Sequence, residues 1–354
     1  MIVNRVLTIA LCCLWASLAH PGFIGWFNDN LIDPQDGKLD TSRHLQSTRG
    51  FLPVPIIITE PAVGFGLGVA VAYFHAPQEL DQDAHPHKGP PSISAGFGAK
   101  TENETYFYGG AHLGVWKDDH IRYLGALAKL DVNLNWYPQS LEDSDFASDG
   151  IDFNIDGMFL LQKMQFRLKE SNWWLGVNYL YVEADNTFKI MDHLPIDLPN
   201  PRFDFSLGAV GALVEYDGRN TIFTPSDGIK AKVEYRSYDE RWGSDFDYHH
   251  LAGTVHHYTP IGEYSSLGFR LEGETVSGDV PFFGYPFVNL RGISAMRYQG
   301  KDVLTGEAEY LWGITPRWSL VLFGGVGSTS RINKLGVGGE GETVAAGGVG
   351  FRYR

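Results

Sequence analysis

The sequence is poor in cysteine, in charged residues and in long apolar runs. Only two of its 354 residues are cysteine, so neither a disulfide scaffold nor a thiolate centre is expected. After the N-terminus no apolar run reaches the length of a membrane-spanning helix. Charged residues make up 20%, too few for a disordered chain. The formal net charge of −14 would repel phosphates, so no nucleic-acid partner is expected.

Glycine and aromatic side chains are plentiful instead. The chain contains 42 Gly, 22 Phe, 17 Tyr and 9 Trp. This glycine content exceeds the usual share of about 7%, and together with the aromatic residues it favours a protein built of β-strands. A soluble two-sheet protein and a membrane β-barrel both stay open here, because only every second residue of a barrel strand must be apolar.

The N-terminus has the pattern of a secretory signal peptide. Arg5 precedes an apolar stretch over residues 6–18, and the small side chain of Ala19 suits cleavage after that residue. A lipoprotein cut before Cys12 fits badly, because Leu11 stands where a small residue is needed. A buried first strand or a membrane anchor is the alternative.

This pattern divides the chain into three expected parts. Residues 1–19 form the signal peptide, which contains both cysteines. Residues 20–50 form a short polar periplasmic segment, too short to hold a folded domain. Residues 51–354 form the third part, in which the pattern of strands begins. Export agrees with a remaining chain that needs no disulfide.

From residue 51 onward, segments of about ten residues alternate apolar and polar side chains, with turn residues between them. In residues 64–74 one face carries large apolar side chains and the other only small ones, namely Phe65, Leu67, Val69, Val71 and Tyr73 against Gly66, Gly68, Ala70 and Ala72. This is expected when the large residues face lipid and the small ones face a crowded lumen. Counting such segments predicts an all-β fold, a transmembrane antiparallel β-barrel with about thirteen to fourteen recognisable strands.

Two of these segments carry further expectations. In residues 123–136, Lys129 and Asp131 alternate with apolar side chains and are expected to be wet or paired inside a lumen. In residues 150–168 the apolar side changes near Gly157. Such a change of side predicts a β-bulge, which inserts one extra residue into a strand.

Two connecting sequences go beyond composition. The first, YDGRNTIFTPSDG over residues 216–228, joins two strands with residues suited to tight turns. Its notable positions are Asp217, Arg219, Phe223, Pro225 and Gly228. The second is an Arg-Gly pair within Leu290, Arg291, Gly292 and Ile293, in a loop between strands near residues 276 and 303. Loops of that length are commonly functional or disordered, and this one is too apolar to be simply disordered.

Together these motifs resemble the barrel domain of the bacterial surface antigen superfamily, the BamA/TamA-like outer-membrane proteins. That family has a hairpin of the form Asp-x-Arg followed by Phe-x-Pro-x-x-Gly and, further along the chain, an Arg-Gly loop. The resemblance covers about residues 51–354. It implies a barrel with the family's usual sixteen strands in the bacterial outer membrane, where it moves or inserts proteins or lipids.

In the family the loop folds back into the lumen, and its arginine meets acids on the strands that follow. The resemblance therefore implies that Arg291 pairs with Glu309. Glu307 lies two residues earlier on the same strand, so it is expected on the same inward face as Glu309. A second family acid is expected near Gly324, where this chain has none. In the alternative reading, Arg291 binds only solvent or backbone carbonyls.

The chain departs from the family at both ends. Transport members carry periplasmic accessory domains before the barrel, and residues 20–50 leave no room for one. Five strands usually follow the loop in the family, whereas three are recognisable here. Either two C-terminal strands are expected to be missing from the chain, or the barrel closes with fewer strands.

Catalytic signatures are missing from the sequence, including Gly-x-Ser-x-Gly, His-Glu-x-x-His and a phosphate loop. No catalytic residue, cofactor or metal site is expected. His75, His85 and His87 are expected in a solvated polar loop, and weak metal binding there is the alternative. The expected function is translocation or insertion at the outer membrane, with membrane lipid as a partner and protein clients unidentified. A passive pore for small solutes is the alternative, and an outer-membrane enzyme is the third class.

Overall fold

The computed structural model describes residues 50–75, 91–136, 150–189, 199–221, 224–315, 317–330, 332 and 341–353. The expected signal peptide, the polar segment up to residue 49, His85, His87 and Phe223 lie outside these residues. The chain divides into two units, residues 1–50 with residue 354, and residues 51–353. All that follows concerns the second unit and the strand residue that precedes it.

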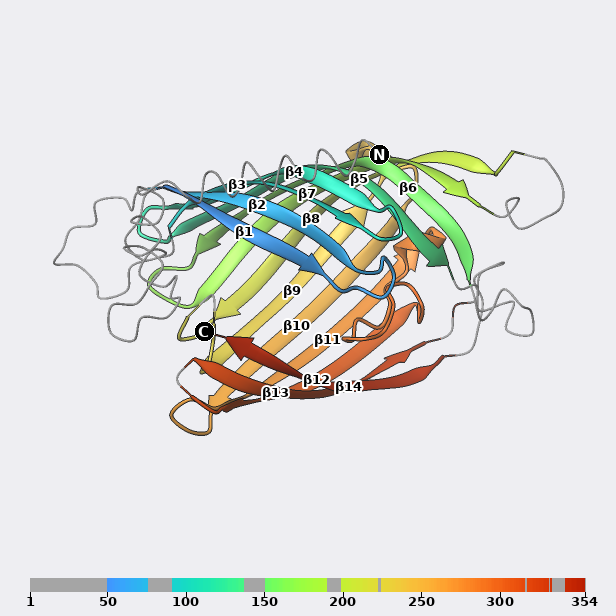
Figure 1. Cartoon of the computed structure of the whole chain (residues 1–354). Coiled ribbons are helices and arrows are strands. Elements are labelled where there is room, and N and C mark those ends of the chain that lie inside the picture. The colour runs from blue at the N-terminus through green and yellow to red at the C-terminus, as the bar shows by residue number, and fades with distance from the viewer. Residues whose placement is uncertain are drawn as a thin grey trace, which may run out of the picture. The chain divides into compact units, whose positions relative to one another are not determined.

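Fourteen strands form one antiparallel sheet in which each strand pairs with the next along the chain (Figure 1). They are β1 (Gly50–Ile58), β2 (Gly66–Phe74), β3 (Ile93–Thr101), β4 (Tyr106–Trp116), β5 (Ile121–Trp136), β6 (Ile151–Arg167), β7 (Trp173–Phe188), β8 (Arg202–Asp217), β9 (Gly228–Tyr238), β10 (Tyr248–Pro260), β11 (Ser266–Gly278), β12 (Asp302–Gly313), β13 (Trp318–Thr329) and β14 (Thr343–Tyr353). Two short 3-10 helices, η3 (Glu240–Trp242) and η4 (Phe282–Gly284), lie in connections. The predicted all-β fold and the number of recognisable strands are confirmed.

The sheet is open among the described residues, since β1 and β14 are its two edges and do not pair with each other. Its strands nevertheless curve around the segment that joins β11 to β12 (Figure 1). The backbone N–H of Ala295 in that segment donates to Glu60 Oε1 in the β1–β2 turn at 3.2 Å. No helix within the described ranges has the length and apolar character to cross a bilayer.

Cross-strand partners share a face of the sheet, so the pairing register separates two faces. We call the face that contacts residues 279–301 the inward face and the other the outward face. The outward face carries large apolar side chains that are 40–75% exposed. They include Leu67, Val69, Val71, Leu127, Leu175, Val177, Val214, Val233, Leu251, Val255, Phe269, Leu271, Leu304, Val326, Val349 and Phe351. In β2 the glycine and alanine side lies inward, as the alternation predicts.

The four longest strands, β5 to β8, reverse this pattern in the half nearest the 279–301 segment. Their outward face there carries a row of four directly paired aspartates, Asp131, Asp156, Asp185 and Asp204. Lys129 forms an ion pair with Asp156 on the same face. The polar side of residues 123–136 is therefore paired on the outward face, and the expectation of pairing inside a lumen is wrong.

The β-bulge predicted near Gly157 is also absent from the structure. Strand β6 pairs residue for residue with β5 and β7 through Gly157, with no inserted residue. The apolar side changes because the surroundings change. Phe153 is fully buried on the inward face at one end of β6, whereas Met158 and Phe166 are exposed on the outward face further along.

Candidate functional site

The 279–301 segment is held against the inward face by an aromatic cluster at η4. The ring of Phe282 lies 4.9 Å from Trp136, 5.6 Å from Phe153, 5.5 Å from Phe188 and 6.4 Å from Phe203, measured between centroids. These partners come from β5, β6, β7 and β8, in the half of each strand where the inward face is apolar. Aromatic pairs at such distances stabilise beyond the apolar area they bury.

The neighbouring ring of Phe283 extends the cluster. Its centroid lies 4.3 Å from Phe205 on β8 and 5.9 Å from Phe246 in the β9–β10 connection. Phe205 is 5% exposed. Two adjacent phenylalanines thus bind one end of the segment to the long strands. This anchor was not predicted from the sequence, although an adjacent Phe-Phe pair in a long apolar loop is a detectable signal.

The Arg-Gly motif lies against the opposite part of the sheet. Arg291 Nη2 donates to Glu307 Oε1 at 2.7 Å and its Nε donates to Oε2 of the same carboxylate at 3.2 Å. Its Nη1 donates to Glu309 Oε2 at 2.8 Å. The guanidinium therefore contacts both acids on β12, in a bidentate and a single contact. It also lies 3.7 Å from the ring centroid of Phe323 on β13.

Phe323 stands on β13 close to the position where the family resemblance implies a second acidic side chain. A cation over an aromatic face is attracted by the ring quadrupole, so β13 contributes a cation–π contact in place of a carboxylate. From the sequence, only the lack of an acid near Gly324 was noted, and no role was predicted for Phe323. Cross-strand pairing places it opposite Glu309, which explains how one guanidinium reaches both.

Small residues on β13 let the loop lie close to the strand. A Cβ at Gly325 would meet Leu290 Cδ2 at 2.6 Å, and a Cβ at Gly327 would meet Val288 Cγ1 at 2.2 Å. Val288 and Leu290 are almost fully buried in a small cluster with Val303. These contacts hold the residues just before Arg291 against β13.

Gly292 supplies the turn after Arg291. Its φ is +88°, a left-handed conformation that glycine adopts without a steric penalty. Ile293 follows and packs against the same cluster as Val288 and Leu290. The four motif residues therefore form one unit, with Leu290 buried, Ile293 partly buried and the arginine turned to β12.

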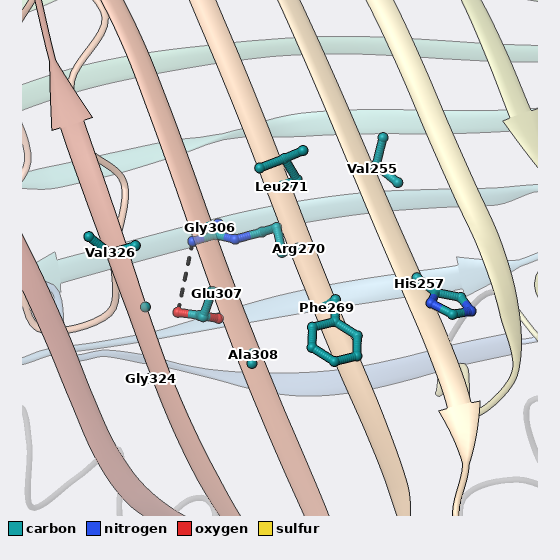
Figure 2. Close-up of a pocket in the computed structure, with 11 residues that line it drawn as sticks. Val255, His257, Phe269, Arg270, Leu271, Gly306, Glu307, Ala308, Gly324 and Val326 are labelled. Carbon is teal, nitrogen blue, oxygen red and sulfur yellow. Dashed lines mark ion pairs between the residues drawn. The ribbon is translucent and has the colours of Figure 1, made fainter.

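Two further arginines balance the charge around this motif. Arg270 Nη2 donates to the backbone oxygen of Asn289 at 2.5 Å and lies 3.9 Å from Glu307 Oε2 (Figure 2). Arg352 Nη2 donates to Glu309 Oε1 at 2.9 Å. Each carboxylate therefore contacts at least two cations, which keeps partly buried charges paired.

The described residues of the 216–228 connection contact one another within the motif. Arg219 Nε and Nη2 donate to the two carboxylate oxygens of Asp217 at 2.8 and 2.9 Å. Gly228 has a φ of +99°, and a Cβ there would lie 2.2 Å from the backbone oxygen of Gly218. Pro225, three residues before Gly228, is half-buried. Phe223, the fifth motif residue, lies outside the described residues.

A shallow apolar groove lies on the outward face of β10 to β13 (Figure 2). Its volume is about 430 Å³. Gly306, Ala308 and Gly324 form its floor, and larger side chains such as Phe269 and Leu271 flank it. The alternation that places large residues outward is interrupted here by small ones, so the surface is hollowed.

Within the described residues, no group of three or more His, Cys, Asp or Glu side chains is placed to hold a metal ion. His75 is the described member of the polar histidine loop. Its Nε2 shares a hydrogen bond of 2.9 Å with Ser94 Oγ, which in turn contacts His112 Nδ1 at 2.8 Å. His85 and His87 lie outside the described residues.

Comparison with known proteins identifies the fold. No family model and no curated protein matches the sequence. Among solved structures, a BamA from Haemophilus ducreyi lacking POTRA domains 1–3 is similar, with a TM-score of 0.57 and 11% identity over 86% of this chain. CdiB from Acinetobacter baumannii is similar with a TM-score of 0.51 and 8% identity over 86% of this chain. The chain has the fold of these two barrels.

The predicted resemblance is thus confirmed at the level of the fold. The match spans 64% of the BamA chain and 53% of the CdiB chain, which is less than two thirds of either. At this level of identity, fold likeness does not by itself assign an activity.

Proposed function

We propose that this chain is an outer-membrane β-barrel protein of the bacterial surface antigen superfamily. The support is the shared fold, together with an outward face whose large apolar side chains would otherwise meet water. Contiguous exposed apolar surface of this kind marks a membrane or protein contact. Membrane lipid is the partner that this face fits.

Cell fractionation and gel mobility test this location. The protein is expected in the outer-membrane fraction, and boiled and unboiled samples are expected to migrate differently on a mild gel because folded barrels resist detergent. Recovery from the soluble periplasm, with identical migration of both samples, would contradict the proposal.

Within the outer membrane, we propose that the protein moves or inserts proteins or lipids, with residues 279–301 held inside the lumen. The observation that carries this proposal is the contact of Arg291 with Glu307, Glu309 and Phe323. A segment anchored there and at Phe282 crosses the inward side and leaves less room for free diffusion of solutes. A passive pore has no need of such an anchored segment.

A passive pore for small solutes is the second candidate, and the charged inward wall of β6 to β9 favours it. Lys163, Glu215, Lys230, Lys232 and Glu234 lie there and would line a wet path. Conductance in a planar bilayer separates the two functions. A low conductance that rises in Arg291→Ala supports the anchored loop, whereas a large, steady conductance unchanged by Arg291→Ala indicates a pore.

Insertion activity has its own test. Vesicles that contain the protein are expected to accelerate insertion of an unfolded outer-membrane β-barrel compared with empty vesicles. The Arg291→Ala variant is expected to insert it more slowly than the wild type. Equal rates in loaded and empty vesicles would contradict the insertion role for that client and leave the membrane location to be judged by fractionation.

A further inference from the structure

A second pocket lies on the inward face, far along the strands from the aromatic cluster. It is formed by β4, β5, β6, β8 and β9 together with Arg219 and has a volume of about 150 Å³. Leu113 and Val115 form an apolar side. The polar side carries Arg122, Lys163, Gln165, Glu215, Asp217, Arg219 and Lys230.

The charge of this pocket is opposite to that of the chain. Its lining includes four basic side chains and two acidic ones, whereas the whole protein has a formal net charge of −14. Low-dielectric walls that carry one sign of charge concentrate ions of the other sign. The pocket therefore favours an anion within an acidic protein.

Most of the charged groups in the pocket are already fixed by partners. Arg122 Nε and Nη2 donate to Asp119 at 2.6 Å each, and its guanidinium lies 4.0 Å from the ring centroid of Trp174. Arg219 is paired with Asp217. These groups define a preformed wall and need no further ligand.

Two donors in the pocket have no such partner. Gln165 is only 5% exposed, and its Nε2 is buried without a hydrogen bond to any described residue. Its side chain lies over Gly176, where a Cβ would stand 2.8 Å from Gln165 Cγ. A buried polar group left without a partner is costly, so native proteins rarely keep one without a reason.

Lys163 is the second donor. It lies two residues before Gln165 on the same face of β6, and it is half-buried. Its ammonium makes no hydrogen bond or ion pair with the residues that the structure describes. Glu215 and Glu234 act on it only from longer range, and each is paired with other cations, Glu215 with Lys230 at 3.5 Å and Glu234 with Lys232 and Arg236. An ammonium group that is partly removed from water needs a counter-ion.

We propose that this pocket binds a phosphate group through Lys163 and Gln165. Both unpartnered groups are hydrogen-bond donors, so the ligand must offer acceptor oxygens. With Arg122, Arg219 and Lys230 paired to Asp119, Asp217 and Glu215, the Lys163 ammonium is the cation of the lining that is left over, so the ligand is expected to be an anion. A phosphate carries about −1.5 to −2 at pH 7 and has three strong acceptor oxygens, so it is expected to bind this ammonium and the Gln165 amide more tightly than a carboxylate with a single charge and two oxygens. The group is either free inorganic phosphate or the end group of a phosphorylated lipid.

Calorimetric titration of the folded, full-length protein in detergent tests this site. The probes are inorganic phosphate and short-chain phosphatidic acid, with acetate for comparison, all at matched ionic strength. At least one phosphate probe is expected to bind more tightly than acetate. Lys163→Met and Gln165→Leu are each expected to weaken that binding at least about tenfold, because each removes a hydrogen bond to a charged ligand.

Lys129→Met is the matched control. Lys129 lies on the neighbouring strand but on the outward face, paired with Asp156. Its replacement removes the same charge from the protein and is expected to leave phosphate binding unchanged. Gel mobility before and after boiling verifies that every variant is folded.

Tighter binding of inorganic phosphate assigns the site to a free anion, and tighter binding of phosphatidic acid assigns it to a lipid headgroup. The proposal is overturned if neither phosphate probe binds, if acetate binds as tightly, or if folded Lys163→Met binds phosphate as the wild type does. These results do not depend on conductance or insertion, so they are distinct from failure of the proposed function.

Discussion

The two halves of β6 have opposite polarity on both of their faces. In the half near η4, Phe153 is buried inward and Asp156 lies outward. In the other half, Lys163 and Gln165 lie inward, while Phe166 is exposed outward. Strand geometry is continuous between the halves, so the difference lies in what each face contacts.

This comparison shows that alternation in a strand reports the surroundings of its faces and not only its geometry. Side chains alternate with a period of two whatever surrounds them. One half contacts the aromatic anchor of the 279–301 segment inward and carries the aspartate row outward. The other half contacts the charged pocket inward and presents apolar side chains outward, where we place the lipid. A strand whose apolar side chains move from one face to the other therefore crosses a boundary between two environments.

The largest expected effect comes from truncating the inward aromatic side chain. Phe153→Ala is expected to lower the free energy of unfolding by about 3–5 kcal/mol, because Phe153 is fully buried against Phe188 and Phe282. Phe166→Ala, in the other half of the same strand, removes an exposed ring and is expected to cost less than about 1 kcal/mol. Urea-induced unfolding in lipid vesicles measures both. Equal losses would remove the distinction between the halves.

A charge on the outward face separates the halves in a second way. Val177→Arg places a cation among apolar outward side chains of β7 and is expected to cost about 2–4 kcal/mol near the bilayer midplane. Glu183→Arg, on the same face of the same strand but beside the aspartate row, is expected to change stability by less than about 0.5 kcal/mol. The folded yield of each variant in vesicles is compared. Similar yields would mean that the apolar half of the outward face of β7 does not contact lipid.

The polar anchor of the loop is expected to be weaker than its aromatic anchor. Arg291→Ala and Glu309→Ala are each expected to cost about 1–2 kcal/mol, since the pair is hydrogen-bonded but 40% of the arginine side chain is exposed. The double variant is expected to lose less than the sum of the single losses, because the two groups are in contact. Additive losses from urea unfolding would show that the pair is not coupled.

The smallest expected effect is a pH dependence in the β4–β5 turn, at the pocket end of the long strands. The backbone carbonyl of Lys117, 2.7 Å from Nδ1, raises the pKa of His120 above 6.5, and Glu170 at 3.1 Å adds to this. A raised pKa means that the contribution to stability is present below pH 6.5 and is lost as pH rises through the folded pKa. NMR titration of the histidine ring measures it.

Glu170→Gln is the matched variant for that titration. It is expected to lower the pKa of His120 only in part, because the hydrogen bond to the Lys117 carbonyl remains. A pKa of His120 at or below 6.5 in the unaltered protein would contradict this account of the turn.

Much of the fold was predictable because strand alternation and turn residues are local. The glycine and alanine side of β2, the run of antiparallel strands and the conformation needed at Gly228 all follow from neighbouring residues. For the candidate site, Glu307 and Glu309 could be placed on one face because they are two residues apart on one strand. The meeting of Arg291 with both acids was implied by the family resemblance and has no local cause.

The parts that were missed depend on contacts between distant segments. Phe282 lies beside Phe153 only because the 279–301 segment crosses to the long strands. Phe323 lies beneath Arg291 because pairing brings β13 next to β12. The bulge at Gly157 was predicted because one face was assumed to stay apolar along the whole of β6.

By itself the sequence determined the strands, their turns and the two-residue period that assigns neighbouring side chains to opposite faces, since these depend on the backbone and adjacent residues. Only the tertiary structure decided which face each half of β5 to β8 turns to the loop, and that the Lys163 ammonium and Gln165 Nε2 have no hydrogen-bond partner among the residues that the structure describes. The physical reason is that burial and pairing are set by whatever lies across the sheet. A periodic pattern states which residues share a face, but it does not state what that face meets.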